Sequence, residues 1–296
     1  MNEHIKYGVV VLNKPAGPTS HQVSAWARNI LGQEKAGHGG TLDPGVTGVL
    51  PVAMGNSLRA LNALLLGTKE YVGIIRFHRD VDANEVKDIF QEFTGPIYQF
   101  PPVRSAVKRQ IRTRTIHKID MLEKTGRNVL FRVLCESGTY IRTLCGDIGD
   151  ALGVGANMQE LRRTKTACIT EKDSCTLQDL KDAYIFWKDG DESWLREAVK
   201  PMEVMLAHLP GVVIRESAVD AVCHGAPLAA PGMDKVLKDY NQDQTIVLYT
   251  PKGEAVALAR ATIASIKASK RKDGIVSNTT RVLMDPGTYP PGWKKH

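Results

Sequence analysis

A glycine-rich, almost uncharged segment near the N-terminus constrains this chain more than any other feature. Residues 37–51 read GHGGTLDPGVTGVLP, and from Ala36 to Leu58 the only formally charged side chain is Asp43. The proline that follows Asp43 disfavours a helical conformation there, and the glycines around it allow tight turns and close approach of a ligand. The segment therefore predicts a fixed, extended loop that presents one carboxylate.

The residues alone allow two interpretations of Asp43. A turn aspartate that hydrogen-bonds its own backbone would account for a D-P-G sequence. Against this, a carboxylate in apolar surroundings needs a partner. Arg142 is a candidate partner, because it is the only charged residue in the segment 137–146, SGTYIRTLCG. If the two side chains meet, Arg142 holds a buried Asp43 ionised and orients it.

The composition is that of an ordinary globular protein with a basic excess. The 296 residues suffice for one large domain, or for a large and a small one. Lys and Arg number 39 against 32 Asp and Glu, which gives a net charge of +7. This excess suggests a polyanionic partner, although a basic protein without such a partner remains an alternative.

The cysteines favour a reducing compartment. There are five, an odd number, and none forms a C-x-x-C pair. A disulfide framework or a zinc site is therefore not expected, and the chain is predicted to be cytoplasmic. No leader resembles a signal peptide, and no apolar run approaches the ~18 residues that span a membrane.

Strands and helices are predicted to alternate over roughly the first 200 residues. The predicted strands are 8–12, 71–77 and 128–137, and the predicted helices are 19–32, 83–93, 176–188 and one that begins at 147. In the first helix, Trp26 falls on the apolar face with Val23 and Ala27. No G-x-G-x-x-G or G-K-[ST] motif occurs, so a nucleotide-binding sheet is not indicated.

The chain changes character near His208. The next segment contains two Gly/Pro turns, and residues 244–262 predict a hairpin across Pro251-Lys252-Gly253. These patterns predict a small β-rich domain over 209–284, followed by a short tail over 285–296.

A run of basic residues follows residue 101. No acidic residue occurs between Glu92 and Asp120, and that interval contains Arg104, Lys108, Arg109, Arg112, Arg114 and Lys118. On an extended strand, a spacing of about two residues places several of these charges on one face. Such a stripe suits a phosphate backbone, whereas a solvated basic edge strand is the alternative.

Six segments, in this order along the chain, resemble the family of pseudouridine synthases that includes the bacterial enzyme modifying the tRNA T-loop and the dyskerins. They are KPAGPTSH (14–21), GHGGTLDPGVTGVLPV (37–52), KEYVG (69–73), PPVRSAVKR (101–109), GTYIRTL (138–144) and GANMQELRRT (155–164). The resemblance covers nearly the whole chain, and the pairing of G-T-L-D-P with a downstream G-T-Y-I-R is highly specific.

The resemblance points to the archaeal dyskerin-type branch, the catalytic subunit of H/ACA guide-RNA particles. HGAPLAAPGM (224–233) is similar to part of a PUA domain. The implied fold class is α+β: a mixed, mainly antiparallel-sheet catalytic domain over 1–208 and a small β-barrel-like PUA domain over 209–284. Relatives often have an N-terminal extension that packs on the PUA domain, whereas only seven residues precede Gly8 here.

The family's reaction detaches uracil from ribose at N1, rotates it and reattaches it through C5, which implies no cofactor and no metal. The resemblance makes Asp43 the catalytic carboxylate, Arg142 its partner and Tyr71 the aromatic residue that stacks on the target uracil. Asp43 either attacks the sugar or removes a ribose proton, and both routes stay open. Without the resemblance, Tyr71 would be interpreted as a core tyrosine.

Further residues are assigned to RNA on the same basis. The expected substrate contacts are His38, Tyr140, Leu161, Arg104, Lys108 and Arg109, and the expected guide-RNA contacts are His224, Gly225, Ala226, Pro231 and Gly232. Alternatively, Leu161 and Tyr140 are core residues and His38 is a turn histidine. Lys14 and Pro15 are expected to support the Asp43 loop rather than touch substrate.

The resemblance also implies a set of partners. They are an H/ACA guide RNA, rRNA and tRNA substrates, a small scaffold protein, a glycine-arginine-rich-family accessory protein and a kink-turn-binding ribosomal-type protein. Two alternatives are a stand-alone synthase of the tRNA T-loop and a non-catalytic RNA-binding scaffold.

Overall fold

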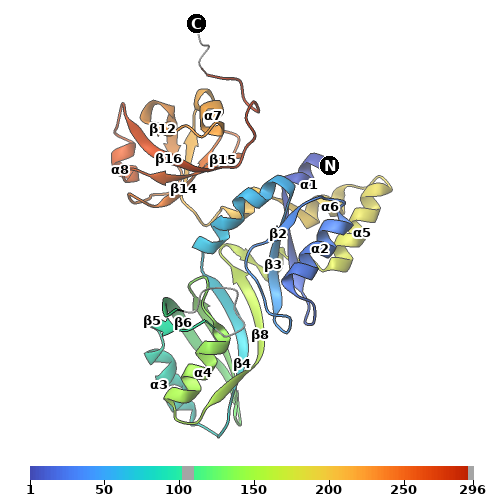
Figure 1. Cartoon of the computed structure of the whole chain (residues 1–296), viewed down its shortest axis with the longest axis vertical. Helices are drawn as coiled ribbons and strands as arrows, with labels where there is room; N and C mark the ends of the chain where they lie inside the picture. The colour runs from blue at the N-terminus through green and yellow to red at the C-terminus, as the bar shows by residue number, and fades with distance from the viewer. Residues whose placement is uncertain (102–109, 293–296) are drawn as a thin grey trace.

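The chain folds around two separate β-sheets (Figure 1). One is formed by strands up to residue 201 and the other by strands from residue 211 onward. The computed structural model describes residues 1–101 and 110–292. Both sheets combine parallel and antiparallel pairs, and antiparallel pairs predominate, which confirms the predicted α+β class. In the described ranges, no helix is both long enough and apolar enough to cross a membrane.

The larger sheet is built from the first two thirds of the chain. Its strand order is β10-β1-β3-β8-β4-β7-β6-β5, with β2 paired to β3 and β9 to β8. β3 and β8 run parallel and join the two halves of the sheet. The strands are β1 (Gly8–Lys14), β2 (Ala36–His38), β3 (Thr47–Met54), β4 (Lys69–Phe77), β5 (Gly95–Gln99), β6 (Arg112–Thr125), β7 (Asn128–Cys135), β8 (Ala156–Thr166), β9 (Ile169–Thr170) and β10 (Val199–Pro201).

Two groups of helices flank the junction between β3 and β8. In Figure 1, α2, α5 and α6 lie together beside β2 and β3, whereas α3 and α4 lie toward the other end, where they contact β6 and β8. The helices of this region are α1 (Asn2–Lys6), α2 (Ser20–Ile30), η1 (Gly55–Leu66), α3 (Ala83–Glu92), α4 (Ile141–Ala151), η2 (Glu171–Asp173), α5 (Leu177–Lys188), α6 (Ser193–Ala198) and η3 (Met202–Met205).

Each helical group has its own apolar core. Val23 of α2 and Leu180 of α5 pack with Leu12 and Leu50 of the sheet. On the other side of the junction, α3 and α4 bury a second cluster against β4, β6 and β7. Full burial of one such side chain contributes about 1.5–3 kcal/mol, so these clusters hold the two halves in place.

The predicted helices are present, but two predictions about them are corrected. Thr19 caps α2 in a reciprocal pair with Gln22. The prediction for Trp26 is wrong: its side chain is 46% exposed, because only part of the apolar stripe of α2 meets the sheet. The start of α4 is also wrong, since the helix begins at Ile141 rather than 147 and buries Ile141 and Leu144 in its first turn.

The smaller sheet follows residue 210 and forms the second part of the fold. Its strand order is β12-β16-β15-β14-β11-β13. The predicted hairpin is confirmed, because β14 and β15 are antiparallel neighbours on either side of Gly253. The elements are β11 (Gly211–Ile214), α7 (Glu216–Cys223), β12 (Leu228–Ala229), η4 (Ala230–Gly232), β13 (Met233–Val236), β14 (Thr245–Tyr249), β15 (Ala255–Ala261), α8 (Ser265–Ala268) and β16 (Ile275–Val282).

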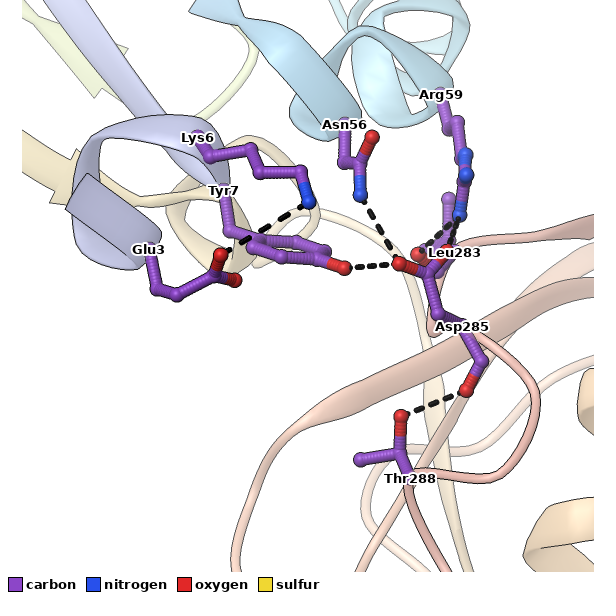
Figure 2. A network of polar contacts seen from close by, with 8 residues as sticks. All are labelled: Glu3, Lys6, Tyr7, Asn56, Arg59, Leu283, Asp285 and Thr288. Carbon is purple, nitrogen blue, oxygen red and sulfur yellow. Dashed lines mark hydrogen bonds and ion pairs between the residues drawn. The ribbon is translucent and has the colours of Figure 1, made fainter.

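A polar cluster joins the N-terminal region to the end of the smaller sheet (Figure 2). The Asp285 carboxylate accepts hydrogen bonds from the Tyr7 hydroxyl, from Asn56 at 3.1 Å and from Arg59 at 2.6 Å. Arg59 also donates to the carbonyl of Leu283 at 3.2 Å. One of the seven residues before Gly8 therefore contacts the chain just beyond the last strand of this sheet.

Candidate active site

The loop between β2 and β3 directs Asp43 outward by burying its neighbours. Leu42 and Val46 are each 4% exposed. The Ser20 hydroxyl donates to the Leu42 carbonyl at 2.9 Å and accepts the Leu42 N–H at 2.8 Å. The Val46 N–H closes a turn on the Asp43 carbonyl at 3.0 Å. These contacts leave the Asp43 side chain on the outside of a loop whose backbone is held at several points.

Lys14 supports the Asp43 loop, as expected from the sequence. Its buried ammonium donates to the carbonyls of Pro15, Pro44 and Val46 at 2.9, 3.0 and 2.9 Å. Burial lowers the pKa of Lys14, and the charge of Asp43 acts in the opposite direction. All three bonds go to backbone carbonyls, and two of these carbonyls, of Pro44 and Val46, directly follow Asp43, so Lys14 stabilises the loop on the C-terminal side of the carboxylate.

Asp43 and Arg142 meet, but they are not buried. Arg142 Nη2 donates to Asp43 Oδ2 at 2.8 Å. The Arg142 side chain is 61% exposed and the Asp43 side chain 57% exposed. The predicted pairing is therefore confirmed and the predicted burial is wrong. The apolar residues that neighbour Asp43 and Arg142 in the sequence point into the core, whereas the two charged side chains point to the surface.

Tyr71 and Leu161 lie in the sheet beside this pair. They are 9% and 8% exposed and belong to the same apolar cluster. Burial raises the pKa of Tyr71, and the positive charge of Arg163 opposes this effect. Asp43 is close enough for its charge to act on Tyr71 in the same direction as burial. The tyrosine thus lies within electrostatic range of the carboxylate, and its hydroxyl is protonated at neutral pH.

Two further predicted contact residues, Tyr140 and His38, lie directly before α4 and at the end of β2. Tyr140 precedes the first turn of α4, and the buried Gln99 side chain bonds both its N–H, at 3.0 Å, and its carbonyl, at 3.1 Å. The His38 ring packs edge-on against His21 with ring centroids 4.9 Å apart. Burial, the His21 ring and the Arg163 charge lower the pKa of His38. His38 is thus favoured in its neutral form, which can accept as well as donate a hydrogen bond.

Sequence reasoning missed Arg163. It lies on β8 with 1% exposure, and its guanidinium donates to the carbonyls of Val49 and Gly40 at 2.8 and 3.0 Å. The neighbouring Arg162 bonds to Glu171, Thr47 and Asn13 instead. Two adjacent arginines on a strand point to opposite faces, so the Arg-Arg pair itself signals that one of them faces inward.

The basic run is only partly described. Arg104, Lys108 and Arg109 lie outside the described residues. On β6, Arg114 pairs with Glu136 at 3.1 Å and Lys118 with Asp120 at 2.8 Å. Acidic residues from beyond the acid-free interval therefore neutralise part of the predicted stripe, because strand pairing brings Glu136 of the following segment beside Arg114.

The residues assigned to the guide RNA lie at the two ends of α7, next to the smaller sheet. His224 Nδ1 contacts the Asp220 carbonyl at 2.8 Å, and its side chain is 61% exposed. Gly225 has a φ of +88°, and the Ala226 carbonyl accepts a bond from Thr279 at 2.7 Å. Pro231 and Gly232 belong to η4, directly before β13. The two segments lie at opposite ends of α7: His224 follows its last residue, whereas the Gly232 carbonyl accepts the N–H of Arg215, which precedes its first residue, at 2.8 Å.

Among the residues that the structure describes, no group of three or more His, Cys, Asp or Glu side chains could hold a metal ion.

The sheet also has a cavity of about 370 Å³, which is lined by Asn13, Lys14, Pro15, Thr47, Arg162, Thr176, Leu177 and Gln178. Asp43 and Tyr71 are not part of that lining, so the cavity is separate from the ion pair.

Four family descriptions match successive parts of the chain. Residues 1–24 match the DKCLD (NUC011) domain, 28–141 the TruB family pseudouridylate synthase (N terminal domain), 142–207 the tRNA pseudouridylate synthase B C-terminal domain and 210–283 the PUA domain. The "Probable tRNA pseudouridine synthase B" of Methanocaldococcus jannaschii is 53% identical over 98% of this chain and 87% of that protein. Its counterpart from Methanopyrus kandleri is 54% identical over 99% and 87%.

Solved structures agree with this assignment. A crystal structure of a Cbf5-Nop10-Gar1 complex contains a chain that is 49% identical, with a TM-score of 0.92 over 97% of this chain and 88% of the other. A structure of an H/ACA RNP bound to a substrate RNA containing 2'-deoxyuridine matches with 47% identity and a TM-score of 0.91, over 98% and 89%. The chain belongs to the TruB family of pseudouridylate synthases and carries a C-terminal PUA domain.

Proposed function

We propose that this chain converts uridine to pseudouridine in RNA at positions that a guide RNA selects, as the catalytic subunit of an H/ACA ribonucleoprotein. The observation that carries the proposal is the Asp43–Arg142 pair, 2.8 Å apart and within electrostatic range of Tyr71. The similarity to a chain from an H/ACA RNP bound to substrate RNA supports the guided form of the reaction.

The reaction is an isomerisation in which Asp43 supplies the reactive carboxylate. The N1–C1′ bond breaks, the uracil turns, a C5–C1′ bond forms, C5 loses a proton and N1 gains one. In one route Asp43 attacks C1′ and uracil leaves with the N1–C1′ electron pair. In the other, Asp43 removes a ribose proton, and a glycal forms as uracil leaves. Both routes need an ionised carboxylate at this position.

The exposure of Asp43 suits a macromolecular substrate. A carboxylate that is 57% exposed is accessible to a nucleotide without movement of the surrounding core. Once RNA covers the pair, water leaves and the attraction between the two charges increases. Arg142 then orients the carboxylate, Tyr71 stacks on the uracil, and Leu161 and Tyr140 line the place that the base occupies.

The target uridine has to leave its stack before Asp43 can reach it. Unstacking and unpairing cost a few kcal/mol, and least where the base is already unpaired. Guide–substrate duplexes on both sides of an unpaired target would offset this cost. In this arrangement His38, Arg104, Lys108 and Arg109 contact the substrate strand. His224, Gly225, Ala226, Pro231 and Gly232 contact the guide.

The stand-alone tRNA synthase is the second candidate, because the relatives from Methanocaldococcus jannaschii and Methanopyrus kandleri are named as probable tRNA enzymes. Pseudouridine mapping separates the two. The assembled particle is incubated with rRNA fragments, and the isolated chain with an unmodified tRNA transcript. We expect modification of rRNA only with the matching guide. Efficient guide-free modification of the T-loop would favour the stand-alone enzyme, and no pseudouridine in either assay would refute both.

The proposed partners follow from the similar complexes. Two of the solved structures contain Nop10 together with a chain similar to this one, and one of them also contains Gar1. We infer that this chain binds a small scaffold protein and a glycine-arginine-rich-family protein of these kinds, while the kink-turn-binding protein remains a prediction.

We also propose that the catalytic domain covers residues 1–208, the PUA domain 209–284 and a tail 285–296. The proposed location is cytoplasmic, which the five free cysteines favour.

A further inference from the structure

Among the residues that the structure describes, Arg163 has the largest side chain that is completely buried, and it carries a charge. A guanidinium removed from water needs partners for its N–H groups and for its charge. Among the described residues, no carboxylate forms an ion pair with it. A buried charge without an acidic partner is costly, so the position of Arg163 calls for an explanation beyond packing.

The hydrogen bonds of Arg163 bracket Asp43. Nη2 donates to the Gly40 carbonyl at 3.0 Å, and Nε donates to the Val49 carbonyl at 2.8 Å. Gly40 lies three residues before Asp43, and Val49 lies six residues after it. A guanidinium is planar and its N–H directions are fixed. One rigid group therefore sets the separation between the two ends of the segment that carries the carboxylate.

The backbone of this segment is shaped to reach Arg163. Gly48 pairs with Arg163 between β3 and β8, and its φ is +103°. A Cβ atom at position 48 would lie 2.2 Å from the Arg163 carbonyl oxygen. Only glycine permits so close an approach in this conformation. The end of the Asp43 segment is thus in contact with both the backbone and the side chain of Arg163.

Arg163 also connects this segment to Tyr71. The two residues are paired in the register of β4 and β8. The Arg163 charge opposes the effect of burial on the pKa of Tyr71, and it adds to the effect of burial on the pKa values of His38 and Lys69. The same buried cation therefore lies within range of the carboxylate segment, the stacking tyrosine and the histidine expected to contact RNA.

We propose that Arg163 is a positioning residue of the reaction, which clamps both ends of the Asp43 segment and holds that segment in register with the strand of Tyr71. Arg163 is 1% exposed, so it acts through these groups and does not touch RNA. The inference rests on the proposed function, because it assigns Asp43 and Tyr71 their roles. It makes the arrangement of these two residues depend on a side chain outside the contact surface.

Single-turnover kinetics of the assembled particle test the proposal with two variants. Arg163→Met removes the clamp and the charge, and we expect the rate constant at saturating RNA to fall roughly 100-fold, as misplacement of reacting groups does. Arg163→Lys keeps the charge but lacks the fork that holds two carbonyls, so its rate constant should fall by an intermediate factor of roughly 10. RNA affinity should change less than about 3-fold, because the contact surface is intact.

Arg162→Lys is the matched control. It lies next to Arg163 on the other face of β8, where it bonds to the side chains of Glu171, Thr47 and Asn13 and not to the backbone carbonyls that Arg163 holds. Its rate constant should stay within about 3-fold of wild type. Misfolding of a variant lowers the amplitude of the single turnover and not its rate constant, so the two effects are separable. If Arg163→Met does not fold, Arg163→Lys decides.

Amide hydrogen exchange supplies a readout without activity. Arg163→Met should speed exchange at the N–H groups of Leu42 and Val46, and Arg162→Lys should not. Rate constants and exchange like those of wild type in both Arg163 variants would overturn the proposal while leaving the proposed function intact. If the wild-type particle forms no pseudouridine, the proposed function fails, and exchange alone decides whether the clamp exists.

Discussion

Arg142 Nη2 lies 2.8 Å from Asp43 Oδ2, although 99 residues separate them in the chain. The pair connects the loop that precedes β3 with the first turn of α4. Both side chains are more than half exposed. An exposed ion pair contributes little to stability, typically about 0–1 kcal/mol, so we propose that this pair serves to orient the carboxylate.

Replacing Arg142 with alanine should separate stability from activity. Because the pair is exposed, Arg142→Ala is expected to change the free energy of unfolding by less than about 1 kcal/mol. The single-turnover rate constant should fall at least roughly 100-fold, because the carboxylate loses its orienting partner. Urea titration and pseudouridine formation measure the two effects. A large loss of stability would show that the pair is buried in solution.

Asp43→Asn should abolish the reaction and preserve RNA binding. The amide is similar in size to the carboxylate but can neither attack C1′ nor take up a ribose proton. The surrounding loop should keep its shape, since its contacts to Ser20 and Lys14 use backbone atoms. Filter binding and pseudouridine mapping on the same preparation provide the check. Turnover at the wild-type rate would exclude Asp43 as the reactive group.

Two substitutions at Tyr71 distinguish its hydroxyl from its ring. Tyr71→Phe keeps the buried ring, and its rate constant should fall roughly 100-fold if the hydroxyl transfers a proton. Tyr71→Ala also removes a ring that is only 9% exposed, which should destabilise the fold by about 3–5 kcal/mol. Thermal unfolding and single-turnover rates are the measurements. A fully active Tyr71→Phe would leave stacking as the only role of this residue.

Asp285 should make the stability of the chain depend on pH. Hydrogen bonds from Tyr7 and Arg59 lower the pKa of this carboxyl group. Its folded-state pKa is therefore below its unfolded-state value of about 3.9. The resulting stabilisation is present above about pH 4 and is lost as the pH falls through the folded-state pKa. We expect Asp285→Asn to lose less stability on acidification than wild type.

Urea titrations at neutral and acidic pH measure this difference. Tyr7→Phe removes one of the donors in Figure 2 and keeps the carboxylate, so it should reduce the effect without abolishing it. Equal acid sensitivity in wild type and Asp285→Asn would show that the cluster between α1, η1 and the chain beyond β16 does not form in solution.

Local features of the fold were predictable because short-range physics sets them. The start of α2 follows from reciprocal capping between Thr19 and Gln22, and the turn before β15 follows from Gly253. The extended loop around Asp43 follows from the proline after it. Each of these signals acts within a few residues, so the sequence alone determined these elements and, through its motifs, the family.

The tertiary structure decided how these elements meet. The exposure of Asp43 and Trp26 depends on which surfaces the distant segments cover, and the sequence indicated burial for both. The roles of Arg162 and Arg163 depend on the register of β8 between β3 and β4, since a shift of one residue would exchange the buried guanidinium for the exposed one. Strand register and burial arise from packing between segments far apart in the chain, which no local pattern specifies.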